Sequence, residues 1–358
     1  VVSWYTPSGQ RRRELFGSTP DDKQLAEARM AVINSELLQE RYFERKEINW
    51  EDFRKRYTDQ VIEGKALASQ PIMIDALDSF ERIMKPNLVS AISTETIDTF
   101  ISRRRKEQNR KYVKKDGTVT QAKRVSPATV NKELRVIKAA LRKASRWGYL
   151  PKVPDFDFER EPQKLVTFMP EAHFVKIYDA CDKATMPDSL SVDAGTWWRS
   201  FLVMGYLTGW RVSELLAVKW EDINLETGTA ITRHCDNKGK RDEMVPLLPM
   251  VIDHLTMMGR KPSGHVFVWD HDRRMLDKVF QRIQAAAQVK PEHTKDHYTF
   301  HDLRRGFATV NHGRVTGDVL QKLMRHQSYE TTRKYLNLGA DLAAATPKLF
   351  VPSLKIAN

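Results

Sequence analysis

The first fifty residues show two different patterns of apolar positions. Residues 1–18 contain two β-prone runs separated by Pro7-Ser8-Gly9, which predicts two short strands joined by a turn. From Thr19-Pro20 onward the apolar residues recur every three or four positions, which predicts a helix with one apolar side. That side consists of Ala26, Met30, Ile33 and Leu37.

From residue 48 to residue 150 the apolar spacing is helical. One helix opens at Trp50–Tyr57, and another has Phe100 and Ile101 facing inward. A third begins at Ser126-Pro127, because serine caps a helix N-terminus and proline suits the first turn. Its apolar side consists of Val130, Leu134, Ile137 and Leu141. The pattern predicts a separate helical domain.

A break in this pattern separates the two halves of the chain. Residues 151–164 combine three prolines with four acidic residues, which is typical of an extended linker at which helices end. A small antiparallel sheet is predicted over 221–248. The other predicted elements of 165–340 are helices over 170–182, 195–217, 273–288, 302–313, 317–326 and 328–335. The predicted fold class is mainly α with a small antiparallel sheet (α+β).

Positive charge is concentrated in the helical domain. The 358 residues carry a net charge of +13 with a pI near 9.6, which favours a polyanionic partner. Between Ile97 and Leu150, sixteen Lys or Arg residues stand against four Asp or Glu, a net charge of +12. Such a run is often only a solvated face, although phosphate contacts require the same residues. The predicted DNA contacts are Arg103, Arg104, Arg105, Lys106, Lys132, Arg135, Lys138 and Arg142.

The composition indicates the cellular compartment in which the protein is expected to work. Cys181 and Cys235 have neither metal-site spacing nor a disulfide framework, so we expect a reducing, cytoplasmic compartment. No run approaches about twenty apolar residues, which argues against a membrane span. The chain begins at Val1 with neither a methionine nor a signal peptide, so we expect its true start to be missing.

Six polar side chains of the second half could together attack one phosphodiester. Two guanidinium groups can grip the non-bridging oxygens and offset the charge that builds up in the transition state. A tyrosine hydroxyl can attack the phosphorus and hold the phosphate covalently. This chemistry needs neither a metal nor another cofactor. The predicted catalytic residues are Arg211, Lys238, His301, Arg304, His326 and Tyr335.

Each of these residues also has a simpler explanation. Arg211 could be satisfied by Glu214 alone, in a structural ion pair. Lys240 competes with Lys238 for the place in the turn of the predicted sheet. The two histidines could cap a helix or lie on its surface, and neighbouring His297 and His312 are interpreted as structural.

The nucleophile has its own competitors. Tyr329 lies three residues after His326, but it lacks the Thr331-Thr332 pair that leads to Tyr335. Ser213 and Ser328 are not credible nucleophiles, because neither stands on a hydrolase-type elbow and no base is placed for either.

The order and spacing of these residues resemble the tyrosine recombinase (phage integrase) family over roughly 165–340. The matching motifs are Arg211-Val212-Ser213-Glu214-Leu215, Lys238 eight residues before Pro246, His301-x-x-Arg304, and His326 with Tyr335 nine residues later. Three positions depart from the family pattern. Arg325 stands where glycine is usual before the histidine, Arg305-Gly306 replaces His-Thr, and Asn337 replaces a histidine.

The resemblance implies a role for each catalytic group. The two arginines would clamp the phosphate that Tyr335 attacks, and Lys238 would protonate the departing 5′ oxygen. His301 would accept or position the phenolic proton, and His326 would donate to a non-bridging oxygen.

The resemblance also implies a division of labour among domains that clamp DNA. Residues 1–47 would be a partial arm-binding-like module, or else a helix packed on the next domain or on a sister subunit. Residues 48–150 would form the helical core DNA-binding domain, joined by the 151–164 linker to the 165–340 catalytic domain. The 341–358 tail would be exchanged between subunits, or else would fold back on its own domain.

The implied function is that of a site-specific DNA recombinase or integrase, as found on mobile genetic elements. It would cleave and rejoin double-stranded DNA at specific sites through a 3′-phosphotyrosyl intermediate, without metal or ATP. It would act as a homo-tetramer, and accessory DNA-bending proteins are further partners that the family suggests. The alternatives are a type IB topoisomerase-like enzyme and a sequence-specific DNA-binding protein without catalysis. The absence of large clamp domains argues against the first, and the complete set of six groups against the second.

Overall fold

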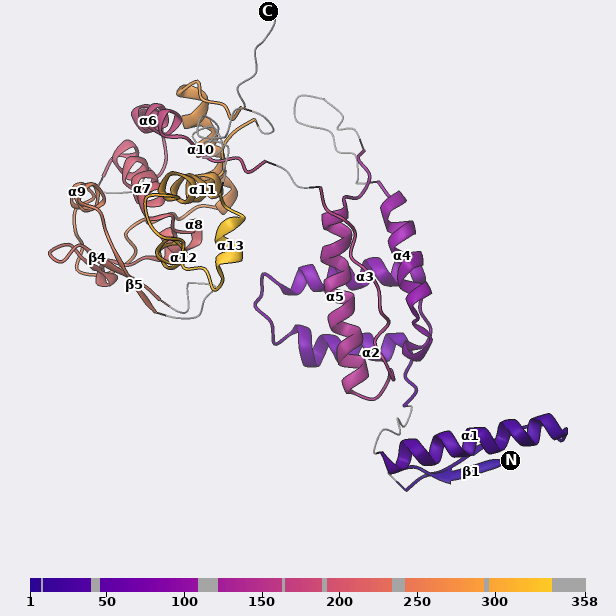
Figure 1. The fold of residues 1–358 in the computed structure, drawn as a ribbon. Coiled ribbons are helices and arrows are strands. Elements are labelled where there is room, and N and C mark those ends of the chain that lie inside the picture. Colours follow the sequence, from indigo (N-terminus) through magenta and orange to yellow (C-terminus); the bar gives the residue numbers. More distant parts are fainter. Residues whose placement is uncertain are drawn as a thin grey trace, which may run out of the picture. The chain divides into compact units, whose positions relative to one another are not determined.

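The computed structural model describes residues 1–7, 9–39, 46–108, 122–162, 165–188, 192–233, 242–292 and 296–336 (Figure 1). The chain divides into two compact units, Val1–Gln163 and Lys164–Asn358, each with its own hydrophobic core. The described residues are mainly helical, with one two-stranded and one three-stranded antiparallel sheet. The predicted fold class is confirmed.

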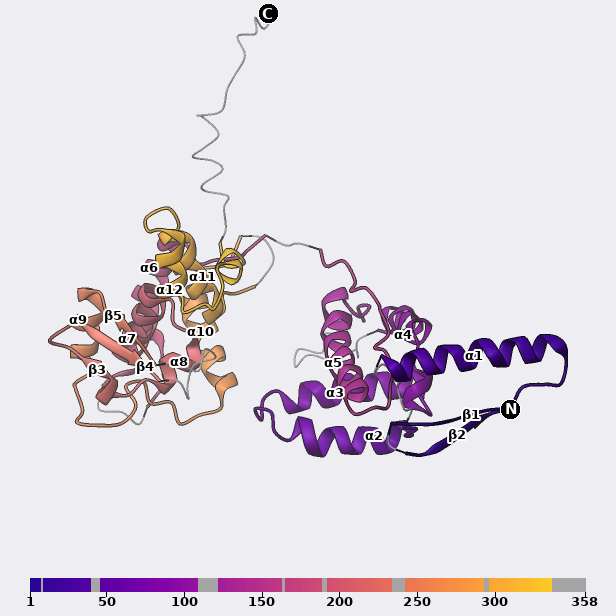
Figure 2. The ribbon, with the colours of Figure 1, turned by 60° about the horizontal axis from the view of Figure 1, so that its bottom comes forward.

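The first unit opens with the strand–turn–strand and helix that the sequence predicts. These elements are β1 (Val2–Tyr5), β2 (Arg11–Glu14) and α1 (Pro20–Leu38). The strands pair antiparallel, and α1 lies beside them (Figure 2). A reciprocal capping box between Thr19 and Asp22 begins α1. Ile33 is fully buried, as its place on the predicted apolar side requires.

The helical part of the first unit is built around one long helix. Its elements are α2 (Trp50–Tyr57), a π-helical turn (Thr58–Ile62), α3 (Gln70–Met84), a 3-10 turn (Val89–Ala91), α4 (Thr94–Lys106) and α5 (Pro127–Arg146). α5 packs against both α3 and α4 (Figure 1). Ser126 caps α5 through the Thr129 N–H, as predicted. The predicted inward residues Val130, Leu134, Ile137 and Leu141 are all fully buried.

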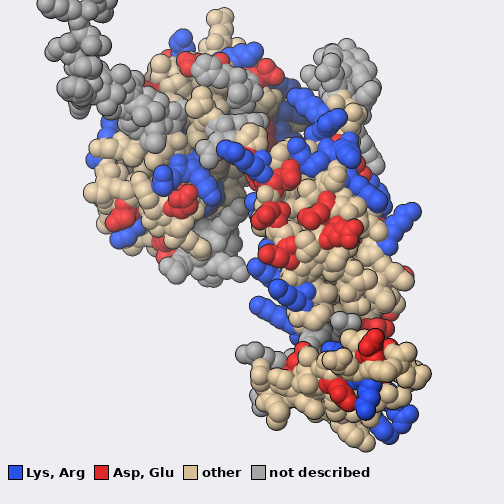
Figure 3. Space-filling view, turned by 45° about the vertical axis from the view of Figure 1, so that its right-hand side comes forward, with Lys and Arg blue, Asp and Glu red and all other residues tan. Residues whose placement is uncertain are grey.

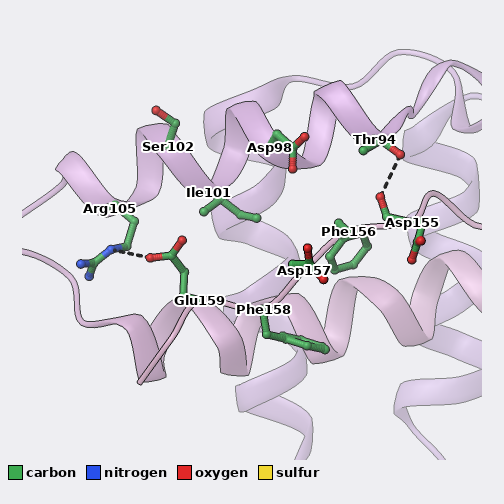
Figure 4. A pocket seen from close by; sticks show the side chains of 10 residues that line it. All are labelled: Thr94, Asp98, Ile101, Ser102, Arg105, Asp155, Phe156, Asp157, Phe158 and Glu159. Carbon is green, nitrogen blue, oxygen red and sulfur yellow. Dashed lines mark hydrogen bonds and ion pairs between the residues drawn. The ribbon is translucent and has the colours of Figure 1, made fainter. Parts of the chain in front are cut away.

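The chain after α5 is extended and is fastened to this helical unit. Phe156 is buried, and the Thr94 hydroxyl donates to the Asp155 carbonyl at 2.9 Å. Asn131 exchanges two hydrogen bonds of 2.8 Å with the backbone of Glu159. Figure 4 shows this segment passing beside the helix that carries Thr94 and Ser102. The segment and α4 line a hollow of about 520 Å³. Much of the predicted linker therefore belongs to the helical unit.

The second unit surrounds a small sheet with helices. Its elements are α6 (Glu171–Asp179), a 3-10 turn (Ala180–Lys183), α7 (Ala194–Thr208), α8 (Val212–Ala217), a 3-10 turn (Trp220–Asp222), β3 (Ile223–Asn224), β4 (Thr229–Thr232), β5 (Glu243–Pro246), α9 (Pro249–Met257), α10 (Arg273–Ala286), α11 (Phe300–Asn311), α12 (Gly317–Leu323) and α13 (Tyr329–Arg333). The strands pair antiparallel in the order β3-β4-β5. The sheet predicted over 221–248 is confirmed.

The core of the second unit gathers on α7. Trp197, Trp198 and Phe201 are fully buried, and Trp198 stacks near Phe280 of α10 and Phe300 of α11. Because α7 is apolar on nearly every side, helices cover it all round, and both α9 and α11 pack along it.

One predicted helix is wrong. The continuous helix expected over 195–217 is broken at Gly209, which adopts a left-handed φ of +63°. A Cβ at this position would lie 2.5 Å from the Phe307 ring, so glycine also permits a close approach of α11. The chain restarts as α8 with Arg211 at its N-cap. α9 was not predicted, while the other predicted helices of this unit are present with shifted ends.

None of the described helices is long and apolar enough to cross a membrane.

Candidate active site

Three of the predicted catalytic groups surround the ring of Tyr335. The ring centroids of His301 and His326 lie 4.9 Å and 4.8 Å from that of Tyr335. The Arg304 guanidinium carbon lies 5.5 Å from the same centroid. His301 and Arg304 come from the first turns of α11, while His326 precedes α13 and Tyr335 follows it. The fold therefore brings together residues that are up to 34 positions apart in the sequence.

Arg304 is held rigidly and is almost completely buried. It donates to the carbonyls of Gly209 and Met324, and its Nη2 lies 2.9 Å from His326 Nε2. Burial, together with the nearby charges of Arg211 and Arg325, lowers the pKa of Arg304 to about 9. These bonds aim the guanidinium at carbonyls and a histidine rather than at a carboxylate. Its charge is thus left for an anion.

The hydrogen bonds of His326 define its tautomer. Arginine can only donate, so the Nε2 of His326 must accept from Arg304. The Nδ1 therefore carries the proton and donates to the Thr332 hydroxyl at 3.0 Å. Burial and the charges of Arg304 and Arg211 lower the pKa of His326 to about 3, so the ring is neutral at pH 7. In this arrangement Nε2 is an acceptor, whereas donation to a phosphate oxygen requires a proton there.

His301 lies closer to solvent. Partial burial of its ring and the charges of Arg305 and Arg304 lower its pKa. The residue itself is exposed, so water screens these charges more than at His326. A neutral imidazole beside the Tyr335 ring is able to accept a proton.

Arg211 lies at the start of α8 and is bound to Glu214. Its Nη1 lies 2.7 Å from Glu214 Oε1, and its backbone N–H donates to Oε2 at 2.8 Å. The Arg211 side chain is 20% exposed, whereas that of Glu214 is 2% exposed. The ion pair considered as a structural explanation is therefore present, yet the guanidinium still reaches solvent.

Two members of this cluster were not predicted from the sequence. Arg325 donates to Glu214 Oε2, and Thr332 accepts from His326. Arg325 was noticed only as a departure from the family pattern, and Thr332 only as part of the lead to Tyr335. The sequence did contain a signal for Arg325, because an arginine stands directly before the motif histidine. Nothing in the sequence pattern indicated the hydroxyl's partner.

The remaining candidates are the two competing lysines and the competing tyrosine, Tyr329. Lys238 and Lys240 lie outside the described residues, although β4 and β5 on either side are in place. Tyr329 packs against Gly317 at the start of α12. Within the described chain, its ring is not among those that contact His301 or His326.

A groove leads to the cluster from the surface. It has a volume of about 470 Å³ and lies between β5 and the turn that joins α12 to α13. Its lining residues are Glu243, Met244, Val245, Gln321, Lys322, Arg325, His326 and Gln327. Of the residues that surround the Tyr335 ring, His326 lines this groove.

The predicted DNA contacts of the helical unit fall into two groups. In Figure 3, Lys and Arg side chains gather at one end of this unit, beside a band of Asp and Glu. In the first group, Arg104 lies 2.7 Å from Glu133, Arg105 lies 3.3 Å from Glu159, Arg135 lies 3.7 Å from Glu161, and Lys138 lies over the Phe156 ring at 4.7 Å. In the second group, Arg103, Lys106, Lys132 and Arg142 are exposed.

The sequence is similar to known recombinases over its second half. Residues 167–341 match the model of the phage integrase family. Tyrosine recombinase XerD of Vibrio vulnificus is 30% identical over 155 residues, 40% of this chain and 49% of the relative. Tyrosine recombinase XerA of Pyrococcus furiosus is 26% identical over 191 residues, 50% of this chain and 60% of the relative. The chain spans about half the length of the curated relatives it matches.

Solved structures share the fold over more of the chain. A lambda integrase tetramer bound to a Holliday junction aligns with a TM-score of 0.58 and 16% identity, covering 93% of this chain and 91% of that one. The Tn1549 transposon integrase in complex with transposon right end DNA aligns with a TM-score of 0.60 and 15% identity, covering 83% and 97%. With the family match and the relatives, the conclusion is that residues 167–341 form a phage integrase family domain, similar to that of tyrosine recombinases.

Proposed function

We propose that this protein is a site-specific DNA recombinase that breaks and rejoins strands through Tyr335. The observation that carries the proposal is the convergence of His301, Arg304 and His326 on the Tyr335 ring. A tyrosine used only for packing does not need two neutral imidazoles and a buried cation around it. A tyrosine that attacks a phosphodiester needs both a proton acceptor and a charge that stabilises the transition state.

The reaction exchanges one phosphate ester bond for another. The Tyr335 oxygen attacks phosphorus, the bond to the 5′ oxygen breaks, and a 3′-phosphotyrosyl link forms. His301 accepts the phenolic proton, and Lys238 supplies a proton to the departing 5′ oxygen. A 5′-hydroxyl from a partner strand then reverses these steps. The ester bond is conserved throughout, so the exchange requires neither ATP nor a metal ion.

Arg211 and Arg304 supply the charge that this reaction requires. Arg304 is prepositioned by two carbonyls, while Arg211 is aimed by Glu214. A preorganised guanidinium pair stabilises the developing negative charge on the non-bridging oxygens without having to rearrange. His326 can join them as a donor once phosphate binding draws Arg304 away from its Nε2 and that nitrogen takes up a proton.

Double-stranded DNA is the proposed substrate, and a homo-tetramer on two duplexes is the proposed assembly. The similar lambda structure is a tetramer on a Holliday junction, and the similar Tn1549 structure holds transposon end DNA. The exposed basic residues of the helical unit offer phosphate contacts that the catalytic cluster does not provide. Accessory DNA-bending proteins stay a prediction.

A nicked suicide substrate tests the proposal. Cleavage next to the nick releases a short strand, so the covalent complex accumulates and migrates as an adduct on a denaturing gel. We expect an adduct with the wild-type protein and with Tyr329→Phe, but none with Tyr335→Phe. An adduct in Tyr335→Phe would refute the assignment. A binding protein forms no adduct at all, and a topoisomerase-like enzyme forms one but joins no two duplexes into a junction.

A further inference from the structure

Arg325 has a backbone conformation that does not suit its side chain. It has a φ of +52°, in the left-handed region that favours glycine. It follows α12 and directly precedes His326. A residue with a side chain is less favourable than glycine at this position, and an interaction that glycine could not make would offset this cost.

That interaction is a buried ion pair with Glu214. The Nη2 of Arg325 donates to Glu214 Oε2, and the two side chains are only 3% and 2% exposed. The guanidinium carbon also lies 4.9 Å from the centre of the Trp210 ring. Its Nε and Nη1 have no hydrogen-bond partner within the described part of the chain. The arginine is thus directed at one carboxylate rather than bound on all sides.

The same carboxylate also holds Arg211. Glu214 Oε1 lies 2.7 Å from Arg211 Nη1, and Oε2 accepts from the backbone N–H of Arg211 and from Arg325. Burial alone would raise the pKa of Glu214, but Arg325, Arg211 and the backbone bond lower it, so the group is ionised. Without Arg325, one buried negative charge would face the positive charge of Arg211 and offset it.

We infer that Arg325 is a positioning residue for the recombination reaction. It balances the charge of Glu214, so that Glu214 can orient Arg211 while the positive charge of Arg211 stays available to the scissile phosphate. The inference rests on the proposed function, because it assigns Arg325 a part in phosphate recognition at that same site.

The first test removes the side chain and leaves a residue that suits the backbone. Arg325→Gly should slow adduct formation at saturating suicide substrate by about 10- to 100-fold. The Kd for intact DNA should change less than threefold, because many other basic residues bind the backbone. Arg325→Lys should recover most of the rate, because it restores a positive charge. Gln288→Gly is a matched control, since Gln288 is an exposed residue of the same unit with a φ of +53°.

The second test separates charge balance from structural support. If Arg325 acts through Glu214, Arg325→Gly should cost no more than about threefold when Glu214→Gln is already present. The Arg325→Gly defect should also shrink on a substrate with a methylphosphonate at the scissile position, because that group lacks the negative charge. A local packing defect would slow both substrates equally. Thermal melting of each variant establishes that it is folded.

The outcomes are distinguishable. If the wild-type protein forms no adduct, the proposed function fails and the inference falls with it. If the wild-type protein forms an adduct and Arg325→Gly forms it equally fast, only the inference fails. If the Arg325→Gly defect is as large in the Glu214→Gln background, Arg325 does not act through Glu214, and the positioning role is wrong.

Discussion

The two units differ in how many carboxylates surround their buried arginines. In the helical unit, Arg104 is 16% exposed and contacts two carboxylates, Glu133 at 2.7 Å and Glu107 at 2.5 Å. In the second unit, Arg211 and Arg325 share one carboxylate, that of Glu214, and Arg304 is directed at carbonyls and a histidine.

This difference distinguishes a cation that stabilises the fold from one that awaits a ligand. A buried arginine with its own carboxylates is satisfied within the protein, so its removal exposes an unpaired charge and weakens the fold. A buried group of arginines with too little negative charge is incomplete until an anion arrives. Sequence alone does not separate the two cases, because it does not show how many carboxylates the fold places beside each arginine.

The largest expected effect is the loss of DNA cleavage when Arg304 is replaced. Arg304→Ala should reduce cleavage by about 1,000-fold or more, because it removes a prepositioned charge at the reacting phosphate. DNA affinity should fall much less. Single-turnover adduct formation and a gel-shift titration measure the two quantities. Arg211→Ala should behave in the same way. Cleavage within tenfold of wild type for either variant would show that the cluster is structural, like the one around Arg104.

The next effect is on stability in the helical unit. Arg104→Gln should lower the free energy of unfolding of that unit by about 3 kcal/mol, because Glu133 is left buried without its partner. Urea unfolding followed by circular dichroism measures the change. Glu133→Gln is expected to do likewise, while the double variant should recover part of the loss. If the Arg104→Gln protein were as stable as wild type but bound DNA more weakly, Arg104 would be a DNA contact rather than a residue that stabilises the fold.

The third effect is a pH dependence of the stability of the second unit. The pKa of His326 is about 3 in the folded protein, below the ordinary histidine value of 6.5. Between these values the unfolded chain binds a proton that the folded protein excludes. Stability is therefore full above about pH 6.5 and falls as the pH decreases, by up to about 1.4 kcal/mol per pH unit. Unfolding of wild type and His326→Gln at pH 7 and pH 5 should show a smaller loss in the variant. Equal losses would mean that His326 titrates normally.

The smallest effect concerns the exposed cations. Lys132→Gln combined with Arg142→Gln should reduce the slope of log affinity against log salt by about 0.9 for each phosphate that the variant no longer neutralises. Arg104→Gln should leave the slope unchanged in the protein that stays folded. Fluorescence anisotropy titrations at several salt concentrations measure these slopes. An unchanged slope in the double variant would make this surface a solvated face.

The features predicted correctly from the sequence are those that neighbouring residues determine, such as where a helix begins and which of its sides is buried. Ser126-Pro127 begins α5 and Thr19 begins α1, because capping needs only neighbouring residues. The inward side of α5 followed from spacing alone. The break at Gly209 was missed because the residues on both sides favour a helix. The left-handed φ of Gly209 ends the helix, and the Phe307 ring, nearly a hundred positions away, leaves no room for a side chain there.

The residues around Tyr335 show the same contrast between features that neighbouring residues determine and features that distant residues determine. Motif spacing selected His301, Arg304, His326 and Tyr335, and the fold brings them together. Arg325 was set aside as a deviation because its partner, Glu214, lies 111 positions upstream. The pairing of Arg104 with Glu133 was missed for the same reason, since the two residues lie on different helices. Long-range partners decide what a charged residue does, and local patterns do not reveal them.

The proposed nucleophile, Tyr335, follows a helix that is too short to be stable alone. α13 has five residues, whereas isolated helices shorter than about 12 residues are marginal in water. Contacts such as that of Thr332 with His326 hold it in place. If Tyr335 is the nucleophile, as proposed, it is available only in the fraction of molecules in which α13 is docked, and the cleavage rate should scale with that fraction. A docked population of about one per cent would slow cleavage about 100-fold with every catalytic atom intact. Amide hydrogen exchange at Tyr335 reads this population directly, because its N–H donates to the Thr332 carbonyl only when the turn is formed.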